Sequence, residues 1–312
     1  MSEFKRLLQA SMKSSDTEET IDVYFTRPIG LVFALFWNKL GVHPNAITIL
    51  SIFLGLGAAY MFYFEDLWHN IMGMVLLMLA NFCDSTDGQM ARLTGKKTLL
   101  GRVLDGFSGN VWFTAIYVVL ALRMQDDNMP FTSTPWGVWI WIPVAVAGLL
   151  SHSPQSSLAD YYRQIHLFFL KGKAGSELDS YEQQIKNYER EKVEGTWWSR
   201  LFYRNYANYC KSQENRTPQF QRFFQLVKER FNGAETMPEG LKERFLAGSR
   251  PLMKYTNILT FNIRAISIYI TCLLNCPWVY LLIEITILNI MYVYMHNTHE
   301  KLSKQCADEL AS

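Results

Sequence analysis

Long apolar runs are the feature that most constrains how this chain of 312 residues can fold. A helix of about 20 predominantly apolar residues is long enough to cross the hydrocarbon core of a bilayer. Aromatic residues gather at the ends of the runs, as they do at membrane interfaces, so the sequence predicts an all-α integral membrane protein with six transmembrane helices. The predicted spans are His43–Phe64, Trp68–Met90, Leu100–Leu122, Trp136–Leu158, Thr256–Leu274 and Trp278–His296.

Two other segments have helical patterns that do not fit a membrane span. Ile29–Trp37 follows Pro28 and is too short to cross, so we expect an interfacial helix lying on the membrane. Residues 171–254 are polar, charged and partly aromatic, and are predicted to form a helical insertion outside the bilayer. The stretch "TWWSRLFYRNYANY" within it fits a solvated surface, a flap on the membrane or over the active site, or a dimer contact.

The predicted elements divide the chain into four parts. A cytoplasmic tail and the interfacial helix occupy residues 1–42, and the tail lacks the early apolar core of a secretory signal. The first four spans occupy residues 43–170, the cytoplasmic insertion 171–254, and the last two spans with a C-terminal tail 255–312. The five cysteines have neither zinc-type spacing nor a disulfide framework, so reduced thiols are expected.

Charges in the short loops predict the orientation, because Lys and Arg are enriched in cytoplasmic loops. The turn after the second span is basic, and the loops on the opposite side are acidic or neutral. The basic residues are Arg92, Lys96, Lys97 and Arg102, and the acidic ones are Glu65, Asp66, Asp126 and Asp127. We therefore expect a multi-pass protein with both termini in the cytoplasm and an active site that faces the same side.

Aspartates lie at the ends of two predicted spans. Asp84 and Asp87 are three residues apart and share a helix face, and Asp105 lies early in the next span. Ionisable groups at such positions cost free energy unless they face a bundle interior or water, so they are functional candidates by default. Grouped carboxylates favour a divalent metal, and hard oxygen ligands suit Mg²⁺ or Mn²⁺. A single aspartate there could instead cap a helix or face water.

Small and basic residues accompany these aspartates at fixed spacing. Gly88 and Ala91 let a ligand or helix approach the backbone, and Arg92 can hold phosphate with its planar guanidinium. The full pattern resembles the signature of the CDP-alcohol phosphotransferases (CDP-alcohol phosphatidyltransferases), D-x2-D-G-x2-A-R-x8-G-x3-D-x3-D. The matching residues are Asp84, Asp87, Gly88, Ala91, Arg92, Gly101 and Asp105. The resemblance is sharpest over residues 41–110, where "HPNAIT" also looks like the family's Pro-Asn element.

The resemblance implies a reaction in phospholipid biosynthesis. Such enzymes attack the β-phosphorus of a CDP-linked alcohol with a second alcohol and release CMP. Two metal ions would bridge the diphosphate and orient in-line displacement. By resemblance, the metal ligands would be Asp84, Asp87 and Asp105, and the CDP site would include Gly88, Ala91, Arg92 and Gly101, with Asn45 and Thr48 as weaker candidates. The implied partners are a CDP-activated lipid, a small alcohol, membrane lipids and a second copy of the chain, with no nucleic acid.

The pattern departs from the family signature at its last position, where Gly109 replaces an aspartate. In the family this aspartate is expected to act as general base for the acceptor hydroxyl and to contact metal, and glycine can do neither. Asn110 does not repair the loss, because it is not titratable and points about 100° further round the helix. His152 or Asp160 could supply the base, or a metal-bound or phosphate-assisted path could remove the proton.

A buried cation marks the acceptor side. Arg264 lies well inside the predicted fifth span, where an Arg usually faces a polar pocket. It could hold an acceptor phosphate, or it could form a salt bridge with Glu284 in the sixth span. Together with basic residues near the same mouth, Arg264 favours a CDP-diacylglycerol-type donor and an inositol or inositol phosphate acceptor.

Catalysis is the favoured interpretation, because the metal and diphosphate part of the signature is intact. The alternative is a catalytically degenerate relative that acts as a lipid- or nucleotide-binding membrane scaffold. A divalent-cation transporter would fit acidic residues between spans, but it would not explain the spacing of Gly, Ala and Arg.

Overall fold

The computed structural model describes residues 3–12, 14, 16–96, 99–231 and 236–311. Within these ranges the chain is largely helical, and its extended pairing is limited to an isolated bridge between Asn128 and Pro135. The prediction of an all-α integral membrane protein is confirmed. Lys97, one of the residues used to predict the orientation, lies outside the described residues.

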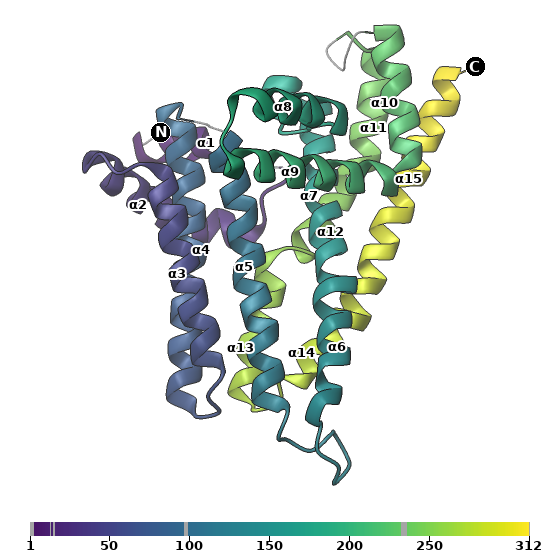
Figure 1. Ribbon diagram of the computed structural model, residues 1–312. Helices are drawn as coiled ribbons and strands as arrows, with labels where there is room; N and C mark the ends of the chain where they lie inside the picture. The colour runs from purple at the N-terminus through teal and green to yellow at the C-terminus, as the bar shows by residue number, and fades with distance from the viewer. Residues whose placement is uncertain (1–2, 13, 15, 97–98, 232–235, 312) are drawn as a thin grey trace. The chain divides into compact units, whose positions relative to one another are not determined.

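The chain folds into two compact units, which are described separately (Figure 1). The first unit contains Met1–Pro154 and Thr260–Asn289, and the second contains Gln155–Leu259 and Ile290–Ser312. The elements of the first unit are α1 (Glu3–Ser11), η1 (Asp22–Thr26), α2 (Arg27–Lys39), α3 (Pro44–Phe62), α4 (Leu67–Thr94), α5 (Leu99–Met124), η2 (Gly137–Ile140), α6 (Trp141–Ala145), η3 (Val146–His152), α13 (Phe261–Leu273), α14 (Trp278–Ile283) and η6 (Glu284–Leu288).

The remaining elements belong mainly to the second unit. They are α7 (Ser153–Lys171), η4 (Lys173–Gly175), α8 (Tyr181–Glu194), α9 (Trp197–Arg216), α10 (Pro218–Phe231), α11 (Glu239–Ser249), η5 (Arg250–Leu252), α12 (Met253–Ile258) and α15 (Asn289–Ala311). The segment predicted as a helical insertion is thus helical in its described residues. The buried aromatic side chains of Phe169, Phe223 and Phe245 pack against one another in the core of this unit.

Five helical stretches among the described residues are long and apolar enough to cross a bilayer. They are Pro44–Phe62, Leu67–Thr94, Leu104–Met124, Gly137–Lys171 and Trp278–Ala311. The predicted span Thr256–Leu274 is interrupted after Ile258, and α13, the helix that follows, has 13 residues. The protein is therefore multi-pass, and the count of six spans stays a prediction.

Local sequence explains why α4 reaches beyond the predicted span. Asp66 caps its start by accepting a hydrogen bond from the His69 N–H at 3.2 Å. Its end is marked by Gly95, which has φ +69°, a left-handed conformation that carries no Cβ penalty in glycine. Because the helix continues to Thr94 and does not end at Met90, the whole run from Asp84 to Arg92 is helical.

The membrane-spanning helices of the first unit bury a close-packed core. α3 packs against both α4 and α5. Trp112 of α5 is 2% exposed and lies against Gly55 of α3, where the lack of a side chain makes room for the indole ring. Other apolar side chains point outward, such as Phe53 at 68% and Leu149 at 72% exposure, which suits helix surfaces that contact lipid.

A buried arginine ties together one end of this bundle. Arg123 of α5 donates through Nη1 to the Phe62 carbonyl and to Asn70 Oδ1, both at 2.9 Å. Its Nη2 donates to Asn275 Oδ1 at 2.8 Å. These acceptors come from α3, from α4 and from the turn after α13, so one guanidinium on α5 links four segments.

The N-terminal segment, predicted as a polar tail, is folded onto the first unit. Its helix α1 packs against α2 and α4. Ser11, Ser14, Thr17 and Thr26 are all buried, although they are polar. Hydrogen bonds to nearby backbone carbonyls satisfy Ser11 and Thr17, at 2.8 Å and 3.3 Å.

Replacement of Gly55 by alanine should destabilise the first unit. A Cβ there would lie 2.1 Å from Trp112 Cδ1 and would force a buried ring to move. We expect a loss of about 1–3 kcal/mol, the usual cost of overpacking a core, measured by thermal unfolding in detergent. Gly57→Ala is the matched control, because its Cβ would make an ordinary contact with Leu76 at 3.5 Å. Equal unfolding temperatures for the two variants would contradict this packing.

Candidate functional site

The residues of the motif lie on two consecutive helices of the first unit. The C-terminal part of α4 carries Asp84, Asp87, Gly88, Ala91 and Arg92, and α5 carries Gly101, Asp105 and Gly109. The two helices contact each other, and both pack on α3.

Hydroxyl groups hold two of the motif carboxylates. Asp87 is 4% exposed and accepts a short hydrogen bond from Thr48 Oγ1 of α3. Asp84 accepts a hydrogen bond from Ser108 Oγ at 3.0 Å, and Ser108 Oγ also lies 2.6 Å from the Asp105 carbonyl oxygen. Thr48, a weaker candidate in the sequence, is therefore brought to the carboxylates. Asn45 lies three residues earlier, on the same side of α3.

The three aspartates are close enough to interact electrostatically. Asp105 and Asp84 repel each other, and the charge on Asp87 is repelled by both. Arg27 exerts an opposing, attractive effect on Asp84. Among the described residues, no group of three or more His, Cys, Asp or Glu side chains is arranged so that it could hold a metal ion.

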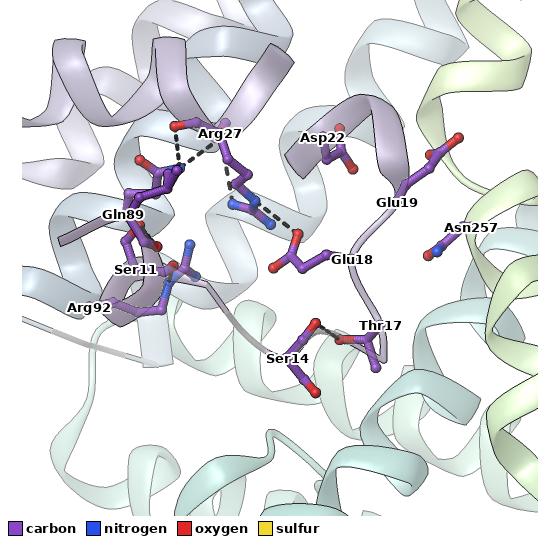
Figure 2. A network of polar contacts seen from close by, with 12 residues as sticks. Ser11, Ser14, Thr17, Glu18, Glu19, Asp22, Arg27, Gln89, Arg92 and Asn257 are labelled. Atoms are coloured by element: carbon purple, nitrogen blue, oxygen red, sulfur yellow. Dashed lines mark hydrogen bonds and ion pairs between the residues drawn. The ribbon is translucent and has the colours of Figure 1, made fainter. Parts of the chain in front are cut away.

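Helix α2, predicted to be interfacial, contributes a cation that the sequence pattern did not indicate. Arg27 Nη1 lies 3.5 Å from Ser85 Oγ, next to Asp84, and Gln89 Nε2 donates to the Arg27 carbonyl at 3.0 Å. Glu18 of the N-terminal segment pairs with Arg27 Nε at 3.0 Å. Figure 2 shows Arg27 between Gln89 and Glu18. An Arg directly before Pro28 gave no signal of this role, because its partners lie far away in the sequence.

The motif arginine is held by the N-terminal segment. Arg92 Nε donates to the Ser11 carbonyl at 2.5 Å (Figure 2). Gly88 lies one turn earlier on α4, and a Cβ there would lie 3.3 Å from Arg92 Nη1. The glycine therefore leaves room for the guanidinium, a packing role beside the ligand approach expected from the sequence.

Position 109 is open. Gly109 is half-buried, and no atom lies within 4 Å of the place where its Cβ would be, apart from its chain neighbours and its own helix backbone. Ser108, beside it, is fully buried and bonded to Asp84. The fold thus accommodates a side chain at position 109 that the sequence does not supply.

The two substitute bases predicted from the sequence lie in different surroundings. His152 is buried, and its Nδ1 lies 3.2 Å from the Tyr117 hydroxyl. Tyr117 is twelve residues after Asp105 on α5, which corresponds to about 18 Å along the helix. Asp160 belongs to the second unit, where Gln164 Nε2 donates to its Oδ1 at 3.4 Å.

The buried arginine of the acceptor side is paired. Arg264 and Glu284 have side chains that are 1% and 0% exposed, and Arg264 Nε lies 3.1 Å from Glu284 Oε2. Arg264 Nη1 also donates to the Thr260 carbonyl at 3.0 Å. Of the two interpretations that the sequence allowed for this residue, the structure shows the salt bridge.

A multi-pass helical bundle with carboxylates gathered on two neighbouring helices defines a class of membrane protein with an acidic site among its helices. The sequence model of the CDP-alcohol phosphatidyltransferase family matches residues 41–155, which include α3, α4, α5 and the whole motif. Residues 41–155 therefore match a CDP-alcohol phosphatidyltransferase domain, in agreement with the resemblance seen in the motif.

Three relatives are similar to parts of this chain. An uncharacterized protein of Aquifex aeolicus is 41% identical over 88 residues, which cover 27% of this chain and 43% of that protein. Archaetidylinositol phosphate synthase of Pyrococcus horikoshii is 38% identical over 67 residues, 22% of this chain and 34% of the relative. Phosphatidylinositol phosphate synthase of Streptomyces avermitilis is 29% identical over 172 residues, 48% of this chain and 68% of the relative. The chain thus spans less than half the length of the first two relatives.

Loss of the Thr48 hydroxyl should destabilise the protein through Asp87. Thr48→Val keeps the shape of the side chain but removes the donor to a buried carboxylate. We expect a loss of about 1–3 kcal/mol, the cost of an unsatisfied buried polar group, measured by thermal unfolding of the metal-free protein. The control is Thr94→Val, because Thr94 Oγ1 bonds only to the Met90 carbonyl of its own helix among the contacts described, at 2.7 Å. A smaller effect at Thr48 than at Thr94 would contradict this assignment.

Proposed function

We propose that this protein transfers a substituted phosphate group from a CDP-linked alcohol, CDP-diacylglycerol being favoured, to an acceptor alcohol and releases CMP. The observation that carries the proposal is the placement of three mutually interacting carboxylates across α4 and α5, inside the residues that match the family. Such a concentration of like charge costs free energy, so its presence at a helix end supports a functional role.

The donor set fits Mg²⁺ or Mn²⁺, because carboxylate oxygens are the hard ligands that these ions prefer. In this proposal Asp84, Asp87 and Asp105 hold the ions, with Thr48 and Ser108 fixing two of the carboxylates. When bound, two such ions would neutralise the diphosphate and favour in-line displacement at phosphorus.

The other motif residues would bind the nucleotide and diphosphate. In this proposal Arg92 would hold phosphate by its guanidinium, for which Gly88 leaves room. Ala91 and Gly101 have small side chains that allow close approach of the CDP moiety. Asn45 and Thr48 would line the α3 side of the same site, and Thr48 already contacts Asp87.

An inositol-type acceptor stays our prediction for the second substrate. Relatives named phosphatidylinositol phosphate synthase and archaetidylinositol phosphate synthase support it. The pairing of Arg264 with Glu284 weakens the case for Arg264 as the group that binds an acceptor phosphate. The homodimer, the cytoplasmic termini and the cytoplasmic active site likewise stay predictions.

Gly109 favours the second candidate, a relative that binds a CDP-lipid without turnover. The fold provides space at position 109 but no carboxylate. The two candidates differ in one measurable property, the release of CMP.

Purified protein supplied with CDP-diacylglycerol, Mg²⁺ or Mn²⁺ and a panel of alcohols is expected to release CMP. Asp105→Asn keeps the size of the side chain but removes its charge, and should lower the rate by about 10²-fold or more, as loss of a preorganised electrostatic group does. Asp126→Asn, an exposed loop residue, is the control and should leave the rate unchanged. Metal-dependent CDP-lipid binding without CMP from any alcohol would instead favour the scaffold.

Divalent cations should stabilise the metal-free protein, because they neutralise carboxylates that repel each other. At a concentration 100 times Kd, one bound ion adds about 2.7 kcal/mol, which thermal unfolding in detergent will detect. Asp84→Asn should lose most of this shift, and Asp126→Asn should keep it. Failure of both Mg²⁺ and Mn²⁺ to raise the unfolding temperature of the unmodified protein would contradict the proposed ligand set.

A further inference from the structure

Any alcohol that attacks phosphorus must lose its proton, so the proposed reaction needs a group that accepts it. Position 109, where the family signature has the expected base, is a glycine and has no side chain to accept the proton. His152 bonds to Tyr117, about 18 Å along α5 from Asp105. The proposed reaction therefore needs another proton acceptor in the first unit.

Residues 18–22 of the N-terminal segment carry three acidic side chains that the motif does not include. Glu18 is engaged with Arg27 at 3.0 Å. Glu19 and Asp22 instead converge on one amide, because Asn262 Nδ2 donates to Glu19 Oε2 at 2.7 Å and to Asp22 Oδ1 at 3.2 Å. The segment is thus fixed at two points, on α2 through Glu18 and on α13 through Glu19 and Asp22. Figure 2 shows Glu18, Glu19 and Asp22 along this segment.

The residue before Asn262 on α13 contacts α5 near the open position. Phe261 directly precedes Asn262, and its ring centroid lies 6.1 Å from the rings of both Trp112 and Phe113. These two aromatic residues follow Gly109 by three and four positions, so they lie about one helical turn beyond it on the same side of α5. Asn262, which binds two carboxylates, therefore follows a residue that contacts α5 about one turn beyond Gly109, and a side chain at position 109 would meet open space.

We propose that Glu19 is the general base for the acceptor alcohol and takes the place of a carboxylate at position 109. The inference rests on the proposed transferase function. Glu19 is preferred to Asp22 for two reasons. First, the Glu19 side chain is longer by one methylene. Second, Glu19 precedes the helix that contains η1, so its carboxylate can reach further than the carboxylate of a residue within the helix. Asp22 then serves as the second acceptor that keeps Asn262 in place.

The chemical step balances without any further reactant. Glu19 accepts the proton of the acceptor hydroxyl while that oxygen forms a bond to the β-phosphorus of the CDP-linked alcohol. The bond between the β-phosphorus and the bridging oxygen breaks, and its electron pair leaves with CMP. The proton on Glu19 is then released to water, and the carboxylate is restored for the next turnover.

The test measures CMP release and CDP-diacylglycerol binding by the full-length protein and its variants. Glu19→Gln keeps the size and the contact with Asn262 but removes the base, so kcat should fall by about 10²-fold or more, with Kd for CDP-diacylglycerol within about threefold. The double variant Glu19→Gln/Gly109→Asp should have a kcat at least about tenfold higher than Glu19→Gln alone, because the new carboxylate enters the open space on α5.

Two further variants separate a base from a structural group. Asp22 also accepts a hydrogen bond from Asn262, and Asp22→Asn should lower kcat much less than Glu19→Gln does. Glu182→Gln makes the same chemical change at an exposed side chain paired with Lys186 on α8, and should leave activity unchanged. A larger loss at Asp22 than at Glu19, or activity of Glu19→Gln within threefold of the unmodified protein, overturns the proposal.

The remaining outcomes distinguish this inference from the proposed function. A loss in Glu19→Gln that comes with weaker CDP-lipid binding and is not rescued by Gly109→Asp assigns Glu19 a structural role. CMP release by Gly109→Asp but not by the unmodified protein overturns the role of Glu19 while leaving the transferase site intact. No CMP from any of these proteins overturns both proposals.

Discussion

Hydrocarbon offers no hydrogen-bond partners, so each polar group inside a membrane-spanning helix must be satisfied within the protein. This constraint determines how the first unit is held together. Arg123 finds its acceptors on three other segments, and Arg264 is enclosed with Glu284. Apolar packing alone provides little driving force between helices in lipid. Specific polar contacts and close approaches such as Gly55 against Trp112 therefore fix the arrangement of the helices.

The same constraint explains the position of the carboxylates. Asp87 is buried but bonded to Thr48, and Asp84 is bonded to Ser108, so each carboxylate has a hydrogen-bond donor within the protein. What remains unfavourable is the repulsion among three like charges. A cation or a cationic side chain can relieve that repulsion, and Arg27 does so in part. The site lies where α4 approaches α2. In the proposed function, this place must admit both a lipid-linked donor and a water-soluble acceptor.

The sequence predicted what short-range patterns determine. Apolar runs indicated the spans, and the spacing of Asp84 and Asp87 placed both on one helix face, as the structure has them. The break between α12 and α13 was missed because apolar residues continue across it, at Ile258, Leu259 and Phe261, and hydropathy does not register a backbone turn. The folded N-terminal segment was missed for a different reason. Its residues are polar and show no amphipathic run beyond α1, and their partners on α2, α4 and α13 are distant in the sequence.

The loss of an aspartate at position 109 has a physical consequence beyond the missing base. A fourth carboxylate on α5, one turn from Asp105, would add to the repulsion that the three others already create. A base carried by the N-terminal segment escapes part of that cost, because Asn262 binds it at a separate point and α5 does not fix its distance from Asp105. The same segment also contacts Arg92 through Ser11 and Arg27 through Glu18. Its placement would therefore affect the proposed diphosphate side and the proposed acceptor side together, and a shift of this segment would change both.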